Sequence, residues 1–193
     1  MPSDTAVPVR LLGLSGSLRR ASNCTGILRT LAGGIADQAE FSIFPLDDIP
    51  PYNADNDGDA APRAVRDLKQ AIAEADGLVV ISPEYNYGMS GVIKNALDWA
   101  SRPAMRSPLK GKPALIMTAS PGYTGGVRAQ AQLRETLAGT LARVIARPQV
   151  VIANVMDKMR DGRLVDEPTL RFAHEALHDL LSEIRLLARA GEG

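Results

Sequence analysis

The sequence of 193 residues contains a single cysteine, Cys24, and this scarcity excludes several classes of protein. One thiol cannot form an internal disulfide framework, and it cannot supply a cysteine-based zinc site. A low-molecular-weight phosphatase is also excluded. Its phosphate loop requires Cys-x5-Arg, whereas here Arg29 follows Cys24 one residue too early.

Long hydrophobic runs and an excess of charge are missing as well. No apolar stretch approaches the roughly 20 residues needed to cross a bilayer. The first residues lack the basic and apolar regions of a signal peptide. Lys plus Arg number 22 and Asp plus Glu number 22, so the formal net charge is zero. We therefore expect a cytoplasmic protein with no nucleic-acid partner and no membrane partner.

Short apolar runs predict the strands of a parallel sheet. Residues 9–14, 78–82, 114–119 and 150–153 carry few charges and lack two-residue alternation, as expected for strands covered on both faces. Residues 40–45 alternate more and predict an edge strand. Between the runs the apolar spacing becomes helical, with a shorter helix expected over 92–100. The stripes are Cys24, Leu28, Leu31 and Ile35; Val65, Leu68 and Ile72; Leu133, Leu137, Leu141 and Val144; and Phe172, Ala176, Leu180, Ile184 and Leu187.

This alternation predicts an α/β fold made of one domain over residues 1–193. Right-handed crossovers give a doubly wound, five-stranded parallel sheet with helices on both faces. In the flavodoxin-like strand order 2-1-3-4-5, the order reverses between the first and third strands. Ligands of such sheets bind beyond the carboxyl ends of the strands at this point. The loops after the first, third and fourth strands are therefore expected to line one crevice.

The loop after the first strand has the composition of a phosphate site. Residues 15–23 read SGSLRRASN and lead into a helix, so hydroxyls, guanidiniums and a helix N-terminus would face an anion. A helix cap with a solvated basic turn is the alternative. The loop matches neither G-x-G-x-x-G nor G-x-x-x-x-G-K-[ST], which argues against a dinucleotide Rossmann site and a P-loop. A phosphate monoester on a mononucleotide fits better.

The other two loops suit a planar ligand. Residues 82–91, SPEYNYGMSG, would bring aromatic rings and backbone amides over the crevice, where a heteroaromatic ring could stack. A rigid turn with locally packed tyrosines is the alternative. Residues 119–126, ASPGYTGG, contain three glycines that allow close backbone approach before the next helix begins. A flexible connection is the alternative here.

Together these loops resemble those of the NADPH-dependent FMN reductase family, a flavodoxin-like group that includes quinone, chromate and azo-dye reductases. The matching segments are GLSGSLRRAS (13–22), SPEYNYGMSGVIKNALDWAS (82–101) and ASPGYTGGVRAQAQLR (119–134). The resemblance covers essentially the whole chain. It implies non-covalent FMN, NADPH or NADH as co-substrate, and a small planar oxidant such as a quinone, reduced in a ping-pong cycle. No catalytic side chain and no metal are expected, because the flavin carries the chemistry.

The resemblance also implies site residues. The FMN phosphate would be held by Ser15, Ser17, Leu18 and Arg19, with Ser22 and Asn23 beside them. The isoalloxazine ring would lie against Pro83, Glu84, Tyr85, Asn86, Tyr87 and Gly88. The other edge of the flavin would face Ser120 and Gly122, with Gly125 and Gly126 just beyond. One departure leaves the contacts of Ser22 and Asn23 open: the family often has S-x-N, whereas here Asn23 follows Ser22 directly and Cys24 takes the usual asparagine place.

Several alternatives stay open at this stage. The resemblance implies a homodimer or homotetramer, with Trp99 and residues 102–112 as interface candidates, although a single Trp on a helix also suits the core. Cys24 is either a reactive thiol at a helix N-terminus or part of the apolar stripe. The rival function is a flavodoxin-type electron carrier without nicotinamide turnover. Zero net charge and the Arg19-Arg20 pair argue against that carrier.

Overall fold

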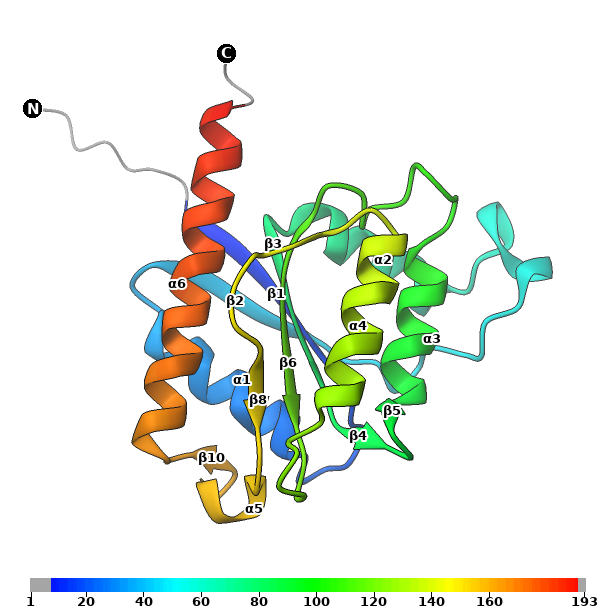
Figure 1. The fold of residues 1–193 in the computed structure, drawn as a ribbon. Helices are drawn as coiled ribbons and strands as arrows, with labels where there is room; N and C mark the ends of the chain where they lie inside the picture. The colour runs from blue at the N-terminus through cyan, green and yellow to red at the C-terminus, as the bar shows by residue number, and fades with distance from the viewer. Residues whose placement is uncertain (1–7, 191–193) are drawn as a thin grey trace, which may run out of the picture.

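A parallel β-sheet forms the centre of the molecule, which the computed structural model describes over residues 8–190 (Figure 1). The strand order is β2-β1-β3-β6, and β6 also pairs on its outer side with the short strands β7 and β8. Every pairing in this sheet is parallel. The strands are β1 (Val9–Ser15), β2 (Ala39–Phe44), β3 (Gly77–Ser82), β6 (Pro113–Ala119), β7 (Arg143–Val144) and β8 (Val150–Ile152). With β7 and β8 sharing one edge position, this confirms the predicted order 2-1-3-4-5.

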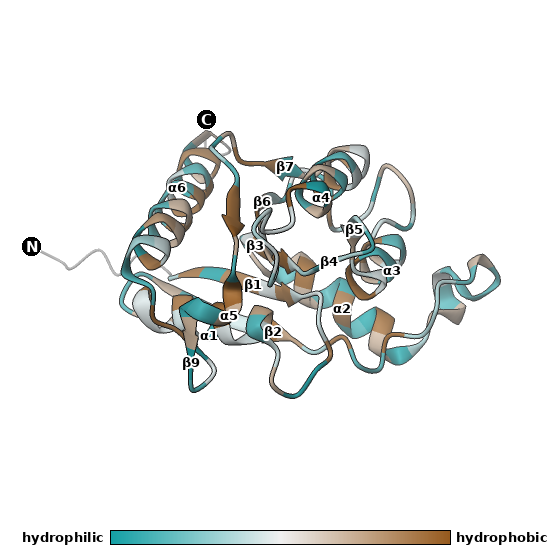
Figure 2. Ribbon diagram, turned by 60° about the horizontal axis from the view of Figure 1, so that its bottom comes forward, coloured by the Kyte–Doolittle hydropathy of each residue, from teal (hydrophilic) through white to brown (hydrophobic). Residues whose placement is uncertain are grey.

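Helices cover both faces of the sheet (Figure 1). On one face, α1 (Asn23–Gly34) and α6 (Glu167–Ala190) share a hydrophobic core with β1, β3, β6 and β8. On the other face, α2 (Arg63–Glu74), α3 (Gly91–Ala100) and α4 (Val127–Gly139) build a second core. Figure 2 shows the resulting pattern of apolar strands between helices of mixed hydropathy. Within residues 8–190, no helix combines the length and apolar character that crossing a bilayer requires.

Smaller elements complete the described chain. Two short hairpins are β4 (Glu84–Tyr85) with β5 (Gly88–Met89), and β9 (Met159–Arg160) with β10 (Arg163–Leu164). A one-turn helix, α5 (Val155–Lys158), follows β8. The segment after β2 contains two 3-10 turns, Ala54–Asn56 and Gly58–Ala60, and projects from the body of the molecule (Figure 1). This projection agrees with its Pro, Asp and Gly content.

The third predicted helical stripe is wrong in its second half. Helix α4 ends at Gly139, so Leu141 and Val144 lie outside it. Leu141 adopts a left-handed conformation with φ of 67°. Its amide donates to the carbonyl of Ala138, and the next amide, of Ala142, donates to that of Leu137. These bonds form a Schellman motif that terminates the helix and releases Val144 into β7.

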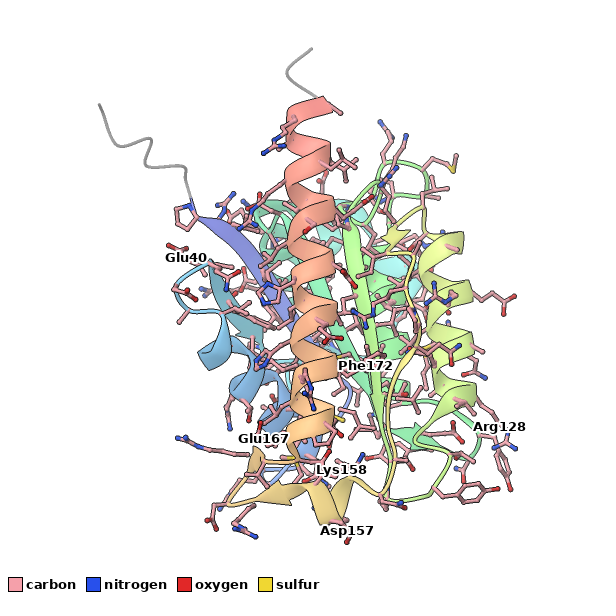
Figure 3. The ribbon with its side chains drawn as sticks, turned by 60° about the vertical axis from the view of Figure 1, so that its left-hand side comes forward. Glu40, Arg128, Asp157, Lys158, Glu167 and Phe172 are labelled. Atoms are coloured by element: carbon pink, nitrogen blue, oxygen red, sulfur yellow. The ribbon has the colours of Figure 1, made fainter. Side chains whose placement is uncertain are left out.

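The last stripe is also displaced at one position. Phe172 is 36% exposed on α6 (Figure 3), where the guanidinium of Arg147 lies 4.9 Å from the centroid of its ring. The neighbouring Ala173 and Leu177 are buried instead. The predicted stripe is therefore confirmed at Ala176, Leu180 and Ile184, which are buried, and is wrong at Phe172.

Trp99 belongs to the core, which rules out its suggested role at an interface between chains. Its side chain is fully buried in the described structure, and its indole Nε1 donates to the Pro50 carbonyl at 2.8 Å. The ring meets Tyr52 edge to face, with centroids 4.9 Å apart. Trp99 therefore anchors the start of the projecting segment to α3.

His174 should make folding stability depend on pH. It packs from α6 against Gly34, where a β-carbon would collide with its ring, and its Nε2 is buried without a hydrogen-bond partner among residues 8–190. Burial, followed by the nearby His178, lowers the pKa of His174 from its ordinary value of 6.5. The unfolded chain then binds more protons than the folded chain between the folded pKa and 6.5. The contribution of His174 to folding stability is therefore fully present above pH 6.5 and is lost as the pH falls through the window.

The matching experiment is thermal unfolding at several pH values. We expect the Tm of the unaltered protein to drop between neutral and mildly acidic pH, and His174→Gln to reduce that drop. The exposed His178 provides the matched control, because His178→Gln should retain most of the pH dependence. An equal drop in His174→Gln and the unaltered protein would contradict this assignment.

Candidate functional site

The loops that follow β1 and β3 are pressed together at the carboxyl edge of the sheet. The strands pair in register up to Ser15 and Ile81. Directly beyond this pair, the Gly16 amide donates to the Ile81 carbonyl at 2.8 Å. A β-carbon on Gly16 would lie 2.6 Å from the Ser90 hydroxyl oxygen and 2.9 Å from Cδ of Pro83. Only glycine therefore allows this approach, and the structure brings the first two of the three predicted loops into contact at this edge.

The loop after β3 is a tight hairpin. Between β4 and β5, Asn86 and Tyr87 both have positive φ, 49° and 67°, as in a type I′ turn. The amide of Met89 donates to Gln132 Oε1 on α4 at 2.9 Å. The guanidinium of Arg128 stacks over the Tyr87 ring, 4.5 Å from its centroid. The hairpin is thus held against the first turns of α4.

Glu84 connects the second and third loops of the site. Its Oε2 accepts hydrogen bonds from the amides of Arg128, at 3.0 Å, and Ala129, at 3.2 Å. The N-cap of α4, Gly126, has no side chain that could satisfy these amides. Glu84 therefore caps α4 from the neighbouring hairpin, and its side chain is only 10% exposed. The pairing of Ser82 with Thr118 places the two loops next to each other for this contact.

The loop after β1 offers a cradle for an anion. Within residues 8–190, no hydrogen bond from the backbone amides of Ser17, Leu18, Arg19 or Arg20 is found. Helix α1 begins directly after this loop, and Ser22 caps it by accepting from the Thr25 amide at 3.2 Å. Unpaired amides, a helix N-terminus and exposed arginines together suit a phosphate. The residues present therefore fit the phosphate end of a mononucleotide.

The predicted ring-binding residues divide into two groups. Tyr85 and Tyr87 expose 52% and 71% of their surface. Arg128 covers one face of the Tyr87 ring, so the ring of Tyr85 and the other face of Tyr87 are accessible for stacking. Pro83 is buried, and Glu84 is engaged with α4. On the facing loop, Ser120 Oγ accepts from the Gly122 amide at 3.2 Å.

Gly125 has a structural reason to be glycine. It has φ of 62°, and a β-carbon there would collide with Val151 on β8. Asn23 is also engaged, since its side-chain amide donates to the sulfur of Met156 on α5 at 3.2 Å. The flavin contacts proposed for Ser22, Asn23, Glu84 and Gly125 would therefore add to these structural roles.

Some residues of this arrangement were not among the predicted contacts. Gly16 sets the distance between two loops, Thr25 donates from its hydroxyl to the Ser15 hydroxyl at 2.8 Å, and Gln132 binds the hairpin. The segments that carry the family resemblance include Gly16 and Gln132, but not Thr25. Their roles depend on contacts between distant residues, which a single sequence does not display.

Cys24 is a buried core residue, which decides between its two alternatives in favour of packing. It is 3% exposed, and burial raises the pKa of its thiol to about 12 despite a backbone hydrogen bond that lowers it. The thiolate is the reactive form of cysteine. We expect no reaction of the native protein with a disulfide reagent near neutral pH, and one thiol per chain after unfolding in guanidinium, measured by absorbance. Rapid labelling of the native protein would contradict this.

The order of the sheet, the reversal between β1 and β3, and an anion cradle at that point define a flavodoxin-like mononucleotide-binding protein. A solved flavodoxin from the domain Archaea shares this fold, with a TM-score of 0.58 at 12% identity over 92% of this chain and 99% of that chain. The chain belongs to the NADPH-dependent FMN reductase family, whose model matches residues 9–157. It is thus an FMN-dependent NAD(P)H oxidoreductase.

Individual relatives agree with this assignment. An NAD(P)H-dependent FMN reductase of Pseudomonas aeruginosa is 37% identical over 180 residues, covering 93% of this chain and 97% of that protein. A quinone reductase of Escherichia coli K12 is 40% identical over 167 residues, covering 84% and 88%. The solved structure of FerB, a flavoenzyme NAD(P)H:(acceptor) oxidoreductase from Paracoccus denitrificans, has a TM-score of 0.79 at 34% identity and covers 92% and 97%.

Proposed function

We propose that this protein reduces small planar quinones with electrons from NADPH or NADH, using FMN held by the three loops at the carboxyl edge of the sheet. The observation that carries the proposal is the contact of the first loop with the second at Gly16, beside a row of unpaired amides. Relatives named as quinone reductases support the class of acceptor. They include a 2-hydroxy-1,4-benzoquinone reductase of Burkholderia, 38% identical over 158 residues.

Each loop has one task in this proposal. The first loop binds the phosphate, the hairpin of β4 and β5 orients the ring, and the loop after β6 faces the other edge. The proposed contacts are Ser15, Ser17, Leu18, Arg19, Ser22, Asn23, Pro83, Glu84, Tyr85, Asn86, Tyr87, Gly88, Ser120, Gly122 and Gly125. We assign them to one FMN-binding domain spanning residues 1–193.

Bound FMN would supply the redox chemistry, accepting hydride from the nicotinamide and passing electrons to the quinone. The protein contributes position and electrostatics. Amides of the hairpin would bond the polar edge of the ring, and amides after Ser120 would offset negative charge on it. The accessible faces of Tyr85 and Tyr87 add an aromatic border that suits planar substrates of several shapes. Neither substrate needs a protein nucleophile.

The proposal includes a homodimer or homotetramer. Large apolar side chains are exposed at the same edge as the site, among them Tyr85 and Tyr87, and Tyr123 exposes 85% of its surface in the loop after β6. Met105 is 66% exposed within residues 102–112, which also carry the exposed Arg102 and Arg106. Light scattering in solution would test this. A strictly monomeric protein at high concentration would exclude the assembly but not the activity.

The decisive test of function is reconstitution with FMN followed by anaerobic mixing with NADPH or NADH. We expect saturable binding of FMN, rapid bleaching of the flavin absorbance by a nicotinamide nucleotide, and recovery of the absorbance on adding a quinone. Steady-state turnover with NADPH and a quinone should show ping-pong kinetics. FMN binding without bleaching would favour the flavodoxin-type carrier instead. Failure to bind FMN would overturn the whole proposal.

A further inference from the structure

A pocket lies next to the phosphate loop, between it and the end of β2, on the side away from β3. It is bounded by the loop after β1, by α1, and by the end of β2 with the residues that follow. Its volume is about 350 Å3, within the range of roughly 300–1,000 Å3 typical of sites for small molecules. Ser17, Leu18 and Arg19 line it and also belong to the proposed phosphate site. The two sites therefore share a wall.

The pocket is strongly basic on one side. Arg19, Arg20 and Arg29 all line it, and none of them takes part in an ion pair within residues 8–190. Arg29 follows Thr25 by four residues, so both project from the same face of α1. Three guanidiniums without carboxylate partners are an arrangement that favours phosphate groups. One phosphate in the shared cradle would leave Arg20 and Arg29 available for another.

The opposite side of the pocket has different chemistry. Ile43, Phe44, Pro45 and Leu46 give it an apolar surface. Asp47 adds an exposed carboxylate just after β2. A carboxylate at the end of the second strand of a doubly wound sheet is well placed to accept hydrogen bonds from the hydroxyls of a ribose. Aliphatic and aromatic side chains beside it suit a flat base.

We propose that this pocket is an adenylate site that takes the AMP half of FAD, while the flavin half occupies the FMN position. The groups that line the pocket match the parts of that ligand. The cradle suits the first phosphate and two further arginines suit the second, while the carboxylate suits the ribose and the apolar side chains suit adenine. The protein would then accept FAD as well as FMN. The inference rests on the proposed flavin site, because FAD enters the pocket only if its flavin lies there.

Calorimetric titration of the apoprotein with FMN and with FAD tests this directly. Arg29 is exposed on α1 and lies outside the phosphate cradle, so the variant R29Q should fold normally. We expect it to raise the Kd for FAD by about tenfold or more, because the loss of one charge-assisted hydrogen bond has an effect of this size. The Kd for FMN should rise by less than about threefold. R171Q is the matched control, because Arg171 is exposed on α6 and outside the pocket. It should change neither Kd.

A third titration, in which ADP is added to the protein already loaded with FMN, distinguishes two occupants of the pocket. One is the AMP half of FAD, and the other is a separate adenine nucleotide. Binding of FAD that depends on Arg29 supports the proposal. Binding of ADP, with no binding of FAD, would overturn it, because the pocket would then serve a separate nucleotide. Equal losses for FMN and FAD in R29Q would also overturn it. Failure of FMN itself to bind would instead refute the proposed function.

Discussion

Replacing Gly16 with alanine is expected to destabilise the protein and to weaken FMN binding. The new β-carbon would meet the Ser90 hydroxyl oxygen at 2.6 Å, and Cγ1 of Ile93 and Cδ of Pro83 at 2.9 Å each. Ser90 is the N-cap of α3, so it cannot withdraw without losing its bond to the Ile93 amide. The loop after β1 must therefore move away from the loop after β3.

Overpacking of this kind costs about 3 kcal/mol at its upper range, which would lower the Tm by roughly 6–12 °C for a protein of this size. The same displacement separates the phosphate cradle from the ring site, so the Kd for FMN should rise by about tenfold or more. Unfolding followed by circular dichroism and titration with FMN measure the two effects.

Gly33→Ala is the control for Gly16→Ala. Gly33 lies within α1, and a β-carbon there would have nothing within 4 Å. Alanine favours a helix by about 1 kcal/mol over glycine, so this variant should be as stable as the unaltered protein or more so. A Gly16→Ala variant with an unchanged Tm and an unchanged Kd for FMN would show that the two loops are not held together at this point.

The parallel sheet could be predicted because strands buried on both faces appear in the sequence as short, continuous apolar runs. Four apolar runs without alternation located β1, β3, β6 and β8 to within a residue or two at each end. The interrupted edge strand could not be predicted in the same way. The apolar spacing continues through Leu141 and Val144 after the helix has ended. What ends α4 is the left-handed backbone of Leu141, and leucine is not a residue that indicates this conformation.

The site was predictable in outline and not in its internal contacts. The position of each loop after a buried strand was sufficient to bring three loops to one edge of the sheet. The sequence does not reveal that the carboxylate of Glu84 reaches α4, 44 residues further along the chain. Nor does the end of β2 carry a recognisable motif, so the pocket beside Arg29 appears only when α1 and β2 are seen packed together.

Glu84→Ala is the other substitution expected to affect both stability and flavin binding. It would remove the acceptor of the Arg128 and Ala129 amides and leave the first turn of α4 without a cap. The hairpin would also lose one of its attachments to α4; the bond between Met89 and Gln132 and the stacking of Arg128 on Tyr87 would remain. Figure 3 shows Arg128 at the end of the molecule where α5 and the site loops lie.

Two charge-assisted bonds to backbone amides, formed by a side chain that is mostly buried, contribute about 2 kcal/mol to stability. The Tm of Glu84→Ala should therefore fall by roughly 4–8 °C. Glu84→Gln retains one carbonyl oxygen that can accept from the same amides, so it should recover much of this loss. Glu175→Ala, an exposed change on α6, should leave the Tm unchanged.

Flavin binding separates a local role of Glu84 from a general loss of stability. With the hairpin loosened, we expect the Kd for FMN to rise several-fold in Glu84→Ala at a temperature where the variant is fully folded. If Glu84→Gln restores the Tm but not the Kd, the charge of Glu84 matters to the site beyond capping, either at the flavin or through its ion pair with Arg128, whose Nη1 lies 3.6 Å from Oε1. If Glu84→Ala changes neither quantity, the capping of α4 by the hairpin contributes nothing to the site, and the link between the hairpin and α4 must come from Gln132 and from the stacking of Arg128 on Tyr87.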